Sequence, residues 1–542
     1  MEFFVILVGL VVIVGVVRAV KKQREKAERE RRLQEQTERK RVQACGEIVR
    51  HFANHFGYLA RQCISREELE SLINSGICSK DLAREIERRM ADKQGLVLGY
   101  QPAGEGQKPD VKLTQEFRDR HVYVIGKSGS GKTNLLRTMI LQDLKAGNGV
   151  GVIAPEQEMI TEEILPYIPE ERLDDVIYFN PADGEAPVSF NPLHLDEGED
   201  IDLRVDENLT IFKRSIGEGG TGPRMDEILR QGFYALLERE GTTLLDFERL
   251  LNREDPTFRN EVIRTSQDET TVRFWRDIYP RFPKEAHLPI TNRLSRLTRP
   301  RTIRNVLCNP LGCLSFRGAI DTGKILLFNL SDGLLGEANS QLLGQLIVSK
   351  FQTAVMSRAD VPPDQRRPFY LYIDEFQTFT GGAAASYEKI LSRARKYRLS
   401  MTLAHQQTGQ IPAHLLKEIF GNVSTLISFV VSREDAGRLA GEFLTEREGQ
   451  ITHVPPEEIL SLKVGEAWCK ISRSTVFLKT YLAPQKPDYQ RVQQVIARSR
   501  LNFGVPLRKG VPEAEQRAVS ARSASGPPSS GTLKDIDPGQ VF

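Results

Sequence analysis

The feature that most constrains this chain is a glycine-rich run that follows a short apolar segment. The run is Gly126-Lys127-Ser128-Gly129-Ser130-Gly131-Lys132-Thr133, and it matches the Walker A pattern at every required position. Its glycines allow successive backbone N–H groups to turn toward one point, and the N-terminus of the following helix adds positive potential. We expect Lys132 to reach the outer phosphates of ATP and Thr133 to ligate Mg²⁺. The alternative is a glycine-rich turn without a nucleotide, but the strand before the run and the helix after it favour a phosphate site.

A second motif stands at the end of a later apolar segment. Residues 369–373 read Phe-Tyr-Leu-Tyr-Ile and are followed by Asp374 and Glu375, which is typical of Walker B. Asp374 is expected to hold Mg²⁺ through water. Glu375 is expected to polarise the attacking water as a base, because a carboxylate beside the metal suits that role. The alternative is that Glu375 only caps the end of the strand.

The next apolar segment, 400–404, ends in His405 and Gln406. Gln406 would then lie beside the Walker B strand end, where its amide can sense the γ-phosphate by hydrogen bonding; the other interpretation is that it only ties down the loop backbone. For His405 we expect a packing role. The basic run before this strand contains Arg395, our candidate for an arginine finger acting in trans, with a solvated basic face as the alternative.

Short strand-like runs alternate with helical runs from residue 111 onward, which predicts an α/β fold with a parallel sheet covered on both faces. The expected strands are residues 121–125, 150–154, 176–179, 325–330, 369–373, 400–404 and 425–431. The alternation stops at about residue 201, where helical runs begin, and resumes after residue 318. We therefore expect one α/β domain in two parts, 111–200 and 319–498, with an all-helical insert over 201–318.

The N-terminal region has a different character. Residues 3–17 are all apolar or glycine, and seven Lys and Arg residues lie between positions 21 and 32. This pattern predicts a single uncleaved transmembrane anchor over residues 1–20, with the rest of the chain in the cytoplasm. We further expect a charged helical stalk over 21–43, a small helical domain over 44–98, a linker over 99–110 and a disordered tail over 499–542.

Composition supports few conclusions beyond this. The chain has 542 residues with a formal net charge of +3, an excess too small to indicate nucleic-acid binding by itself. The six cysteines are scattered and form neither a disulfide framework nor a zinc spacing, so we expect reduced thiols. Any partner must be inferred from architecture.

Residues 111–490 resemble the conjugative DNA-transfer ATPases, the coupling proteins of type IV secretion within the HerA and FtsK superfamily of P-loop ATPases. The resemblance is carried by the Walker A run, Ile373 to Phe376, the spacing from Arg395-Lys396 to Gln406, Phe429 to Ser432 running into Asp435-Ala436, and Gly465 to Ala467. It implies a RecA-like motor domain, ATP and Mg²⁺ as cofactors, a membrane anchor and a homo-oligomer, most often a hexameric ring. It also implies Gln406 as the γ-phosphate sensor and Arg395 as the trans-acting finger.

Two departures limit what carries over. Ala154-Pro155-Glu156-Gln157 stands where many relatives have an acidic or His-Gly-Asp turn, and only one membrane helix is expected where many have two. Contact with a secretion channel or relaxosome-type proteins is therefore less directly implied than the motor itself.

Two functions stay open from the sequence. The first is an inner-membrane, single-pass ATPase whose cytoplasmic motor translocates DNA independently of sequence. The alternative is a membrane-bound ATPase for protein secretion or assembly.

Overall fold

The computed structural model describes residues 95–102, 108–195, 200–214, 222–311, 314–447, 450–482 and 486–507. The expected anchor, stalk and most of the small helical domain (residues 1–94) lie outside these ranges, as does the expected tail from residue 508 onward. Within the described ranges, no helix combines the length and the apolar character needed to cross a bilayer.

The described chain forms two compact units. The first comprises residues 95–179 and 316–502, and the second comprises residues 180–315 together with 503–507. In the sequence, the second unit is thus inserted into the first.

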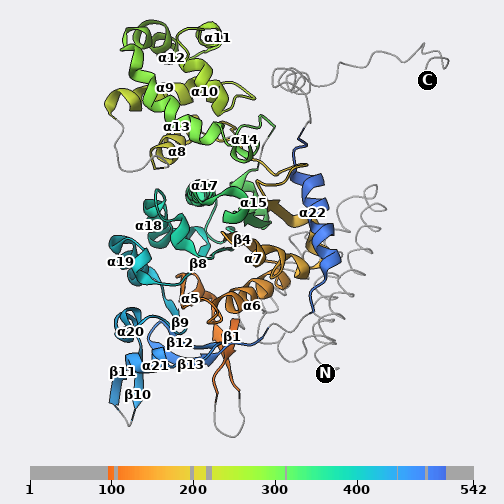
Figure 1. Ribbon diagram of the computed structural model, residues 1–542, viewed down its shortest axis with the longest axis vertical. Helices are drawn as coiled ribbons and strands as arrows, with labels where there is room; N and C mark the ends of the chain where they lie inside the picture. Colours follow the sequence, from red (N-terminus) through yellow and green to blue (C-terminus); the bar gives the residue numbers. More distant parts are fainter. Residues whose placement is uncertain are drawn as a thin grey trace, which may run out of the picture. The chain divides into compact units, whose positions relative to one another are not determined.

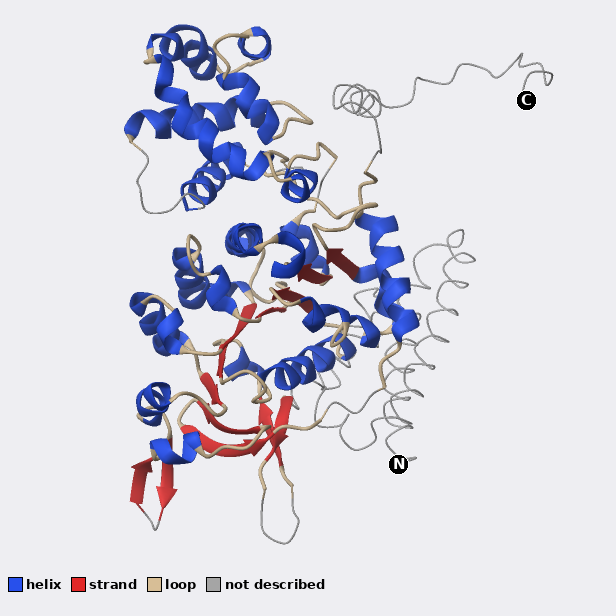
Figure 2. Cartoon of the chain, viewed as in Figure 1, coloured by secondary structure: helices blue, strands red, loops and turns tan. Residues whose placement is uncertain are grey.

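The first unit is built on a mixed sheet of eleven strands, coloured red in Figure 2, in the order β2-β1-β13-β12-β9-β3-β8-β7-β4-β6-β5. Seven strands, from β9 to β5 in that order, pair in parallel, and β12, β13, β1 and β2 add an antiparallel edge. The bounds are β1 Leu96–Tyr100, β2 Asp110–Leu113, β3 Val122–Ile125, β4 Gly149–Ala154, β5 Val176–Phe179, β6 Ile325–Asn329, β7 Phe369–Ile373, β8 Leu399–His405, β9 Thr425–Ser428, β12 Glu466–Ile471 and β13 Ser474–Lys479. The remaining pair of strands, β10 Leu444–Arg447 and β11 Gln450–His453, forms a separate antiparallel hairpin.

The parallel strands are near-continuous runs of apolar residues, and every residue of β3 to β9 is buried. This pattern is expected where helices cover both faces of a sheet. All seven strands expected from the sequence are present, and the bounds of β5 and β7 are those predicted. The mixed α/β fold with a large, mainly parallel sheet is therefore confirmed.

The helices of this unit are drawn in Figure 1. They are α5 Gln115–Arg118, α6 Lys132–Lys145, α7 Gln157–Thr161, α15 Phe316–Thr322, α16 Asp332–Leu335, α17 Glu337–Met356, α18 Ala384–Arg393, α19 Ala413–Asn422, α20 Arg433–Ala440, α21 Pro456–Leu460 and α22 Tyr489–Phe503. Leu135, Met139 and Ile140 of α6 share one buried core with Val124 of β3 and Val152 of β4. This packing seats the helix that follows the Walker A run directly on the sheet.

The described part of the second unit consists of helices and one isolated bridge, Val188 to Gly504. Its helices are α8 Ile201–Arg214, α9 Pro223–Leu237, α10 Leu244–Leu251, α11 Thr257–Thr265, α12 Glu269–Arg273, α13 Leu288–Thr298 and α14 Arg301–Leu307. Thr243 begins α10 with a capping box closed by Asp246, and the fully buried Trp275 donates its ring N–H to the Gln231 carbonyl at 3.1 Å. Cys308 is buried here as a free thiol.

The structure differs from the expected boundaries in three places. The region 99–110, expected to be a linker, contains the end of β1 and the start of β2, because Leu98 and Leu113 of this pair are fully buried. The compact insert runs from Asn180 to Ser315 rather than from 201 to 318. The expected tail begins too early, because α22 continues to Phe503 and the Leu507 N–H then donates to the Glu185 carbonyl at 2.8 Å.

Candidate functional site

The Walker A run forms a tight turn between β3 and α6. Gly131 precedes α6 with φ of 115°, in the left-handed region that favours glycine. A Cβ atom on Gly126 would lie 2.6 Å from Cβ of Phe429, which is too close for any side chain. The loop conformation therefore depends on glycine at both positions.

Neighbouring segments hold this loop through its backbone. The Lys127 N–H donates to the Val430 carbonyl at 2.8 Å, and the Gly465 N–H donates to the Ser130 carbonyl at 2.9 Å. Both partners come from segments that the sequence resemblance singled out. These bonds fix the loop while Lys127, Ser128 and Gly129 at its tip stay exposed.

The Walker B residues lie opposite this loop. β7 is separated from β3 only by β8, and Asp374 and Glu375 follow its last residue. The Lys132 ammonium donates to the Gly126 carbonyl at 2.7 Å and lies 3.8 Å from Oε1 of Glu375. Two motifs far apart in the chain thus meet at the carboxyl ends of β3 and β7, the two strands that flank β8.

Two amides hold the Glu375 carboxylate. Nε2 of Gln406 donates to Oε1 at 2.9 Å, and Nε2 of Gln377 donates to Oε2 at 2.8 Å. Glu375 itself has φ of 42°, a left-handed conformation that is uncommon for a residue with a side chain and turns the chain sharply after β7. The sequence pointed to Gln406 but not to Gln377, whose only signal was its position two residues after Glu375.

Asp374 lies in a strongly perturbed environment. Its residue is only 5% exposed, and burial together with the Glu375 charge raises the pKa of its carboxyl to about 7, against the opposing effect of Lys132. A buried carboxylate of this kind favours a cation beside it. Thr133 lines the same cavity as Asp374, and a hydroxyl with a carboxylate is the oxygen donor set that Mg²⁺ prefers, so these residues fit a magnesium ion.

One cavity contains these groups. The residues that line it are Ser128, Gly129, Gly131, Lys132, Thr133, Asn134, Arg137, Glu156, Glu163, Asp374, Glu375 and Gln406. Asn134, Arg137, Glu156 and Glu163 were not among the predicted site residues. The Arg137 guanidinium pairs with the Glu163 carboxylate and lies 4.9 Å from the Tyr167 ring centroid. These two contacts hold a cationic side chain at the side of the cavity.

The two remaining candidates lie elsewhere. His405 is fully buried against Tyr123 and Phe376, and burial, with Lys132 nearby, lowers its pKa to about 3, which agrees with a packing role. Arg395 is exposed in the turn before β8, whereas Gln406 follows β8. Because a strand of seven residues spans about 23 Å, Arg395 lies at the opposite end of β8 from the cavity.

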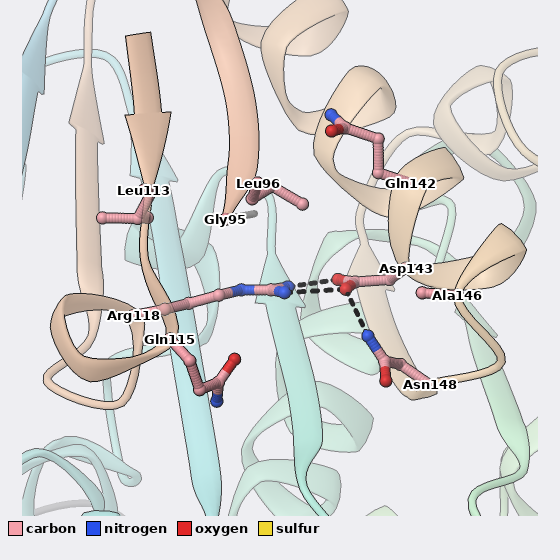
Figure 3. Close-up of a pocket in the computed structure, with 9 residues that line it drawn as sticks. All are labelled: Gly95, Leu96, Leu113, Gln115, Arg118, Gln142, Asp143, Ala146 and Asn148. Carbon is pink, nitrogen blue, oxygen red and sulfur yellow. Dashed lines mark hydrogen bonds and ion pairs between the residues drawn. The ribbon is translucent and has the colours of Figure 1, made fainter. Parts of the chain in front are cut away.

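A separate polar cluster lies beneath α6, shown in Figure 3. The guanidinium of Arg118 faces the carboxylate of Asp143, with one N–H to Oδ1 at 2.7 Å, and the Asn148 amide donates to the same oxygen at 2.9 Å. The Tyr372 hydroxyl accepts from Arg118 at 2.8 Å and donates to Asp143 at 2.6 Å. Burial opposes the charge on Arg118, but Asp143 and the tyrosines raise its pKa above the ordinary value. The cluster ties α5, α6 and β7 together.

The fold and the cavity define this chain as a P-loop protein of the mixed α/β class. Among solved structures it is similar to the bacterial conjugative coupling protein TrwBdeltaN70, with 17% identity over 76% of this chain and 95% of that one and a TM-score of 0.48. It is also similar to the plasmid coupling protein TrwB in complex with ADP and Mg²⁺, with 18% identity, 70% and 90% coverage and a TM-score of 0.49.

A third similar structure is VirB4 of Thermoanaerobacter pseudethanolicus, with 16% identity, 74% and 98% coverage and a TM-score of 0.47. No protein-family model and no curated protein matches the sequence. Likeness at this level does not define a shared activity, which has to be argued from the site.

Proposed function

We propose that this chain is a membrane-anchored ATPase that uses ATP and Mg²⁺ to translocate DNA. The observation that carries the proposal is the meeting of Lys132, Asp374, Glu375 and Gln406 in one cavity at the tip of the glycine-rich loop. Hydrolysis of a phosphoanhydride requires a cation, two carboxylates and an amide, and these four residues supply them.

Each residue has a distinct role in this proposal. The loop N–H groups and Lys132 bind the phosphates, and Thr133 and Asp374 hold Mg²⁺, which when bound neutralises phosphate charge. Glu375 orients the attacking water and accepts its proton. Gln406 contacts the γ-phosphate and, through its 2.9 Å hydrogen bond, keeps Glu375 in place.

Arg395 is proposed to act on a neighbouring subunit. It is exposed at the far end of β8 and cannot reach the cavity of its own chain, so a role at a triphosphate requires a second copy, as in a hexameric ring. Subunit mixing tests this directly. An Arg395→Ala chain keeps an intact cavity, and a Glu375→Gln chain keeps Arg395. If Arg395 acts in trans, mixing these two weakly active variants should restore ATPase activity. No gain of activity on mixing would refute the role in trans.

The hydrolysis step is tested with the full chain purified in detergent. Lys132→Ala should abolish turnover, with Lys145→Ala, an exposed lysine at the end of the same helix, as the matched control. Glu375→Gln should bind ATP but not hydrolyse it, with Glu158→Gln as its control. Normal turnover in either of the two cavity variants would contradict the assignment.

DNA as the transported polymer is supported by the sequence resemblance to the conjugative DNA-transfer ATPases. We expect single- or double-stranded DNA to stimulate the ATPase, and this effect to decline steeply with salt because Lys and Arg contact phosphates. Activity without any response to DNA, together with protein retained on the Glu375→Gln chain, would favour the secretion or assembly function instead.

The membrane anchor is proposed from residues 1–20. The full chain should remain in the membrane fraction after washing with high salt and should be released by detergent. Protease added outside intact cells should leave the motor intact. Release by salt alone, or digestion from outside, would contradict the proposed topology.

A further inference from the structure

The segment that follows β9, residues 429–438, contacts the glycine-rich loop and the turn after β8 but has no part in the chemistry described so far. Its first residues support the glycine-rich loop, since the Val430 carbonyl accepts from Lys127 N–H at 2.8 Å and Phe429 packs under Gly126. Its later residues form the start of α20. The question is what that second part holds.

Asp435, in the first turn of α20, is the centre of a buried hydrogen-bond network. The residue is 3% exposed, and its Oδ1 accepts from the Thr408 N–H at 3.2 Å and from the Thr408 hydroxyl. Its Oδ2 accepts from the Ser432 hydroxyl at 2.9 Å. Arg438, one turn later, donates to the Thr408 hydroxyl at 2.9 Å. Both the backbone and the side chain of Thr408 are therefore bound to α20.

Thr408 lies two residues after Gln406. Before Gln406, the chain is held by β8, where the His405 carbonyl accepts from the Gly126 N–H at 3.2 Å. After it, the chain is held by the bonds of Thr408 to Asp435. Only Gln406 and Gln407 lie between these two fixed points, so their backbone has little freedom. The amide of Gln406 is placed 2.9 Å from the Glu375 carboxylate.

We propose that Asp435 is a positioning residue that acts through Thr408 to hold Gln406 against Glu375. This inference rests on the proposed ATPase function, whose base and γ-phosphate sensor are Glu375 and Gln406. It gives the segment from Phe429 to Asp435 two roles. Its first residues support the glycine-rich loop, and Asp435 in α20 supports the turn that contains Gln406.

A purely structural role would look different. Asp435 also takes part in the cap of α20, because its N–H donates to the Ser432 hydroxyl at 3.2 Å. If capping of α20 were the whole contribution of Asp435, removing the Thr408 hydroxyl would leave turnover unchanged. Any loss of turnover on removing the Asp435 carboxylate would then be the same with and without Gln406.

The test uses the full chain with Asp435→Ala and Thr408→Val. Thr408→Ser keeps the hydroxyl and serves as the conservative rescue, and Arg433→Ala removes an exposed side chain from the same turn. Misplacing a catalytic group by about 1 Å costs up to about 100-fold in rate. We therefore expect kcat to fall about 10- to 100-fold in the first two variants, with KM for ATP and the Kd for ADP within about twofold of the parent.

A double-mutant comparison separates the two roles. In a Gln406→Ala background, Asp435→Ala should cause no further loss of kcat, because its effect passes through the missing amide. An equal loss in both backgrounds would overturn the proposal. So would unchanged turnover in Thr408→Val, or a loss in Thr408→Ser as large as in Thr408→Val.

Amide hydrogen exchange without nucleotide keeps this test separate from the proposed function. Amides of residues 406–410 should exchange faster in Asp435→Ala and Thr408→Val than in the parent and in Arg433→Ala. Absence of ATP turnover in the parent would refute the ATPase function alone. Unchanged exchange in both variants would refute the positioning role, whatever the activity.

Discussion

The cluster beneath α6 allows a stability prediction whose size follows from the structure. Asp143 is completely buried and receives hydrogen bonds from Arg118, Tyr372 and Asn148. Asp143→Ala would leave the guanidinium of Arg118, which is 4% exposed, without its counter-ion, although it would still face the Tyr370 ring at 3.4 Å.

Breaking one partner out of a buried ion pair costs about 3–5 kcal/mol, because the remaining charge stays desolvated. Tyr372→Phe removes only a hydroxyl and should cost about 1–3 kcal/mol. The triple variant Arg118→Met, Asp143→Leu, Tyr372→Phe removes both charges and the hydroxyl together. It should therefore be more stable than Asp143→Ala alone, since apolar replacement of a buried pair is often close to neutral.

Urea unfolding followed by tryptophan fluorescence measures these differences. The chain has two tryptophans, Trp275 in the second unit and Trp468 in β12 of the first. In a Trp275→Phe background, the signal of Trp468 reports the unit that contains the cluster. With a denaturant slope of about 3 kcal/mol per M, Asp143→Ala should lower the midpoint by about 1 M or more.

Two results would refute the reasoning. One is a midpoint in Asp143→Ala within about 0.2 M of the parent, which is less than the cost of a buried unpaired charge allows. The other is a triple variant that is less stable than Asp143→Ala, which would mean that packing of the side chains, not charge, controls this region.

Three further predictions concern the site and its surroundings. Burial lowers the pKa of His121 to about 4 and of His405 to about 3, both from 6.5. Both histidines therefore stay neutral in the folded protein. Their contribution to the free energy of unfolding is fully present above pH 6.5 and is lost as the pH falls, by about 2 kcal/mol for each histidine at pH 5. The urea midpoint should decline between pH 7 and pH 5, and it should decline less in His121→Asn. An equal decline in that variant and in the parent would contradict the lowered pKa of His121. Gly126→Ala should weaken ADP binding about 5- to 150-fold, because its Cβ would meet Phe429 at 2.6 Å. Gly409→Ala, with open space around it, is the control in titrations with fluorescent ADP, and equal affinities would show that the loop can adjust. Gln377→Ala should lower kcat about fivefold with KM unchanged, since Glu375 loses the 2.8 Å amide bond. A change in KM alone would instead assign Gln377 to substrate binding.

Much of the fold could be predicted because its signals are local. The strand of residues 176–179 and the strand of residues 369–373 are apolar runs bounded by polar residues, and the structure has both with the predicted bounds. The pair β1 and β2 was missed because Gly99 and the adjacent polar residues resemble a linker. Leu98 and Leu113 of this pair are buried in a core that includes residues from distant parts of the chain.

The site residues likewise fall into those that could be predicted from the sequence and those that could not. Lys132, Asp374, Glu375 and Gln406 could each be named from a motif, since each follows a strand that the pattern predicts. The roles of Gln377 and Asp435 could not, because their partners are set by how the chain turns after β7 and β9.

The sequence by itself determined which residues are the candidates for phosphate chemistry, because the glycine-rich turn and the acidic strand end are local patterns with a direct physical meaning. Only the tertiary structure decided that they share one cavity. The order β3-β8-β7 brings the carboxyl ends of three strands side by side, although the strands lie far apart in the chain. Neighbours in a parallel sheet are chosen by packing of the whole core, which no single segment encodes.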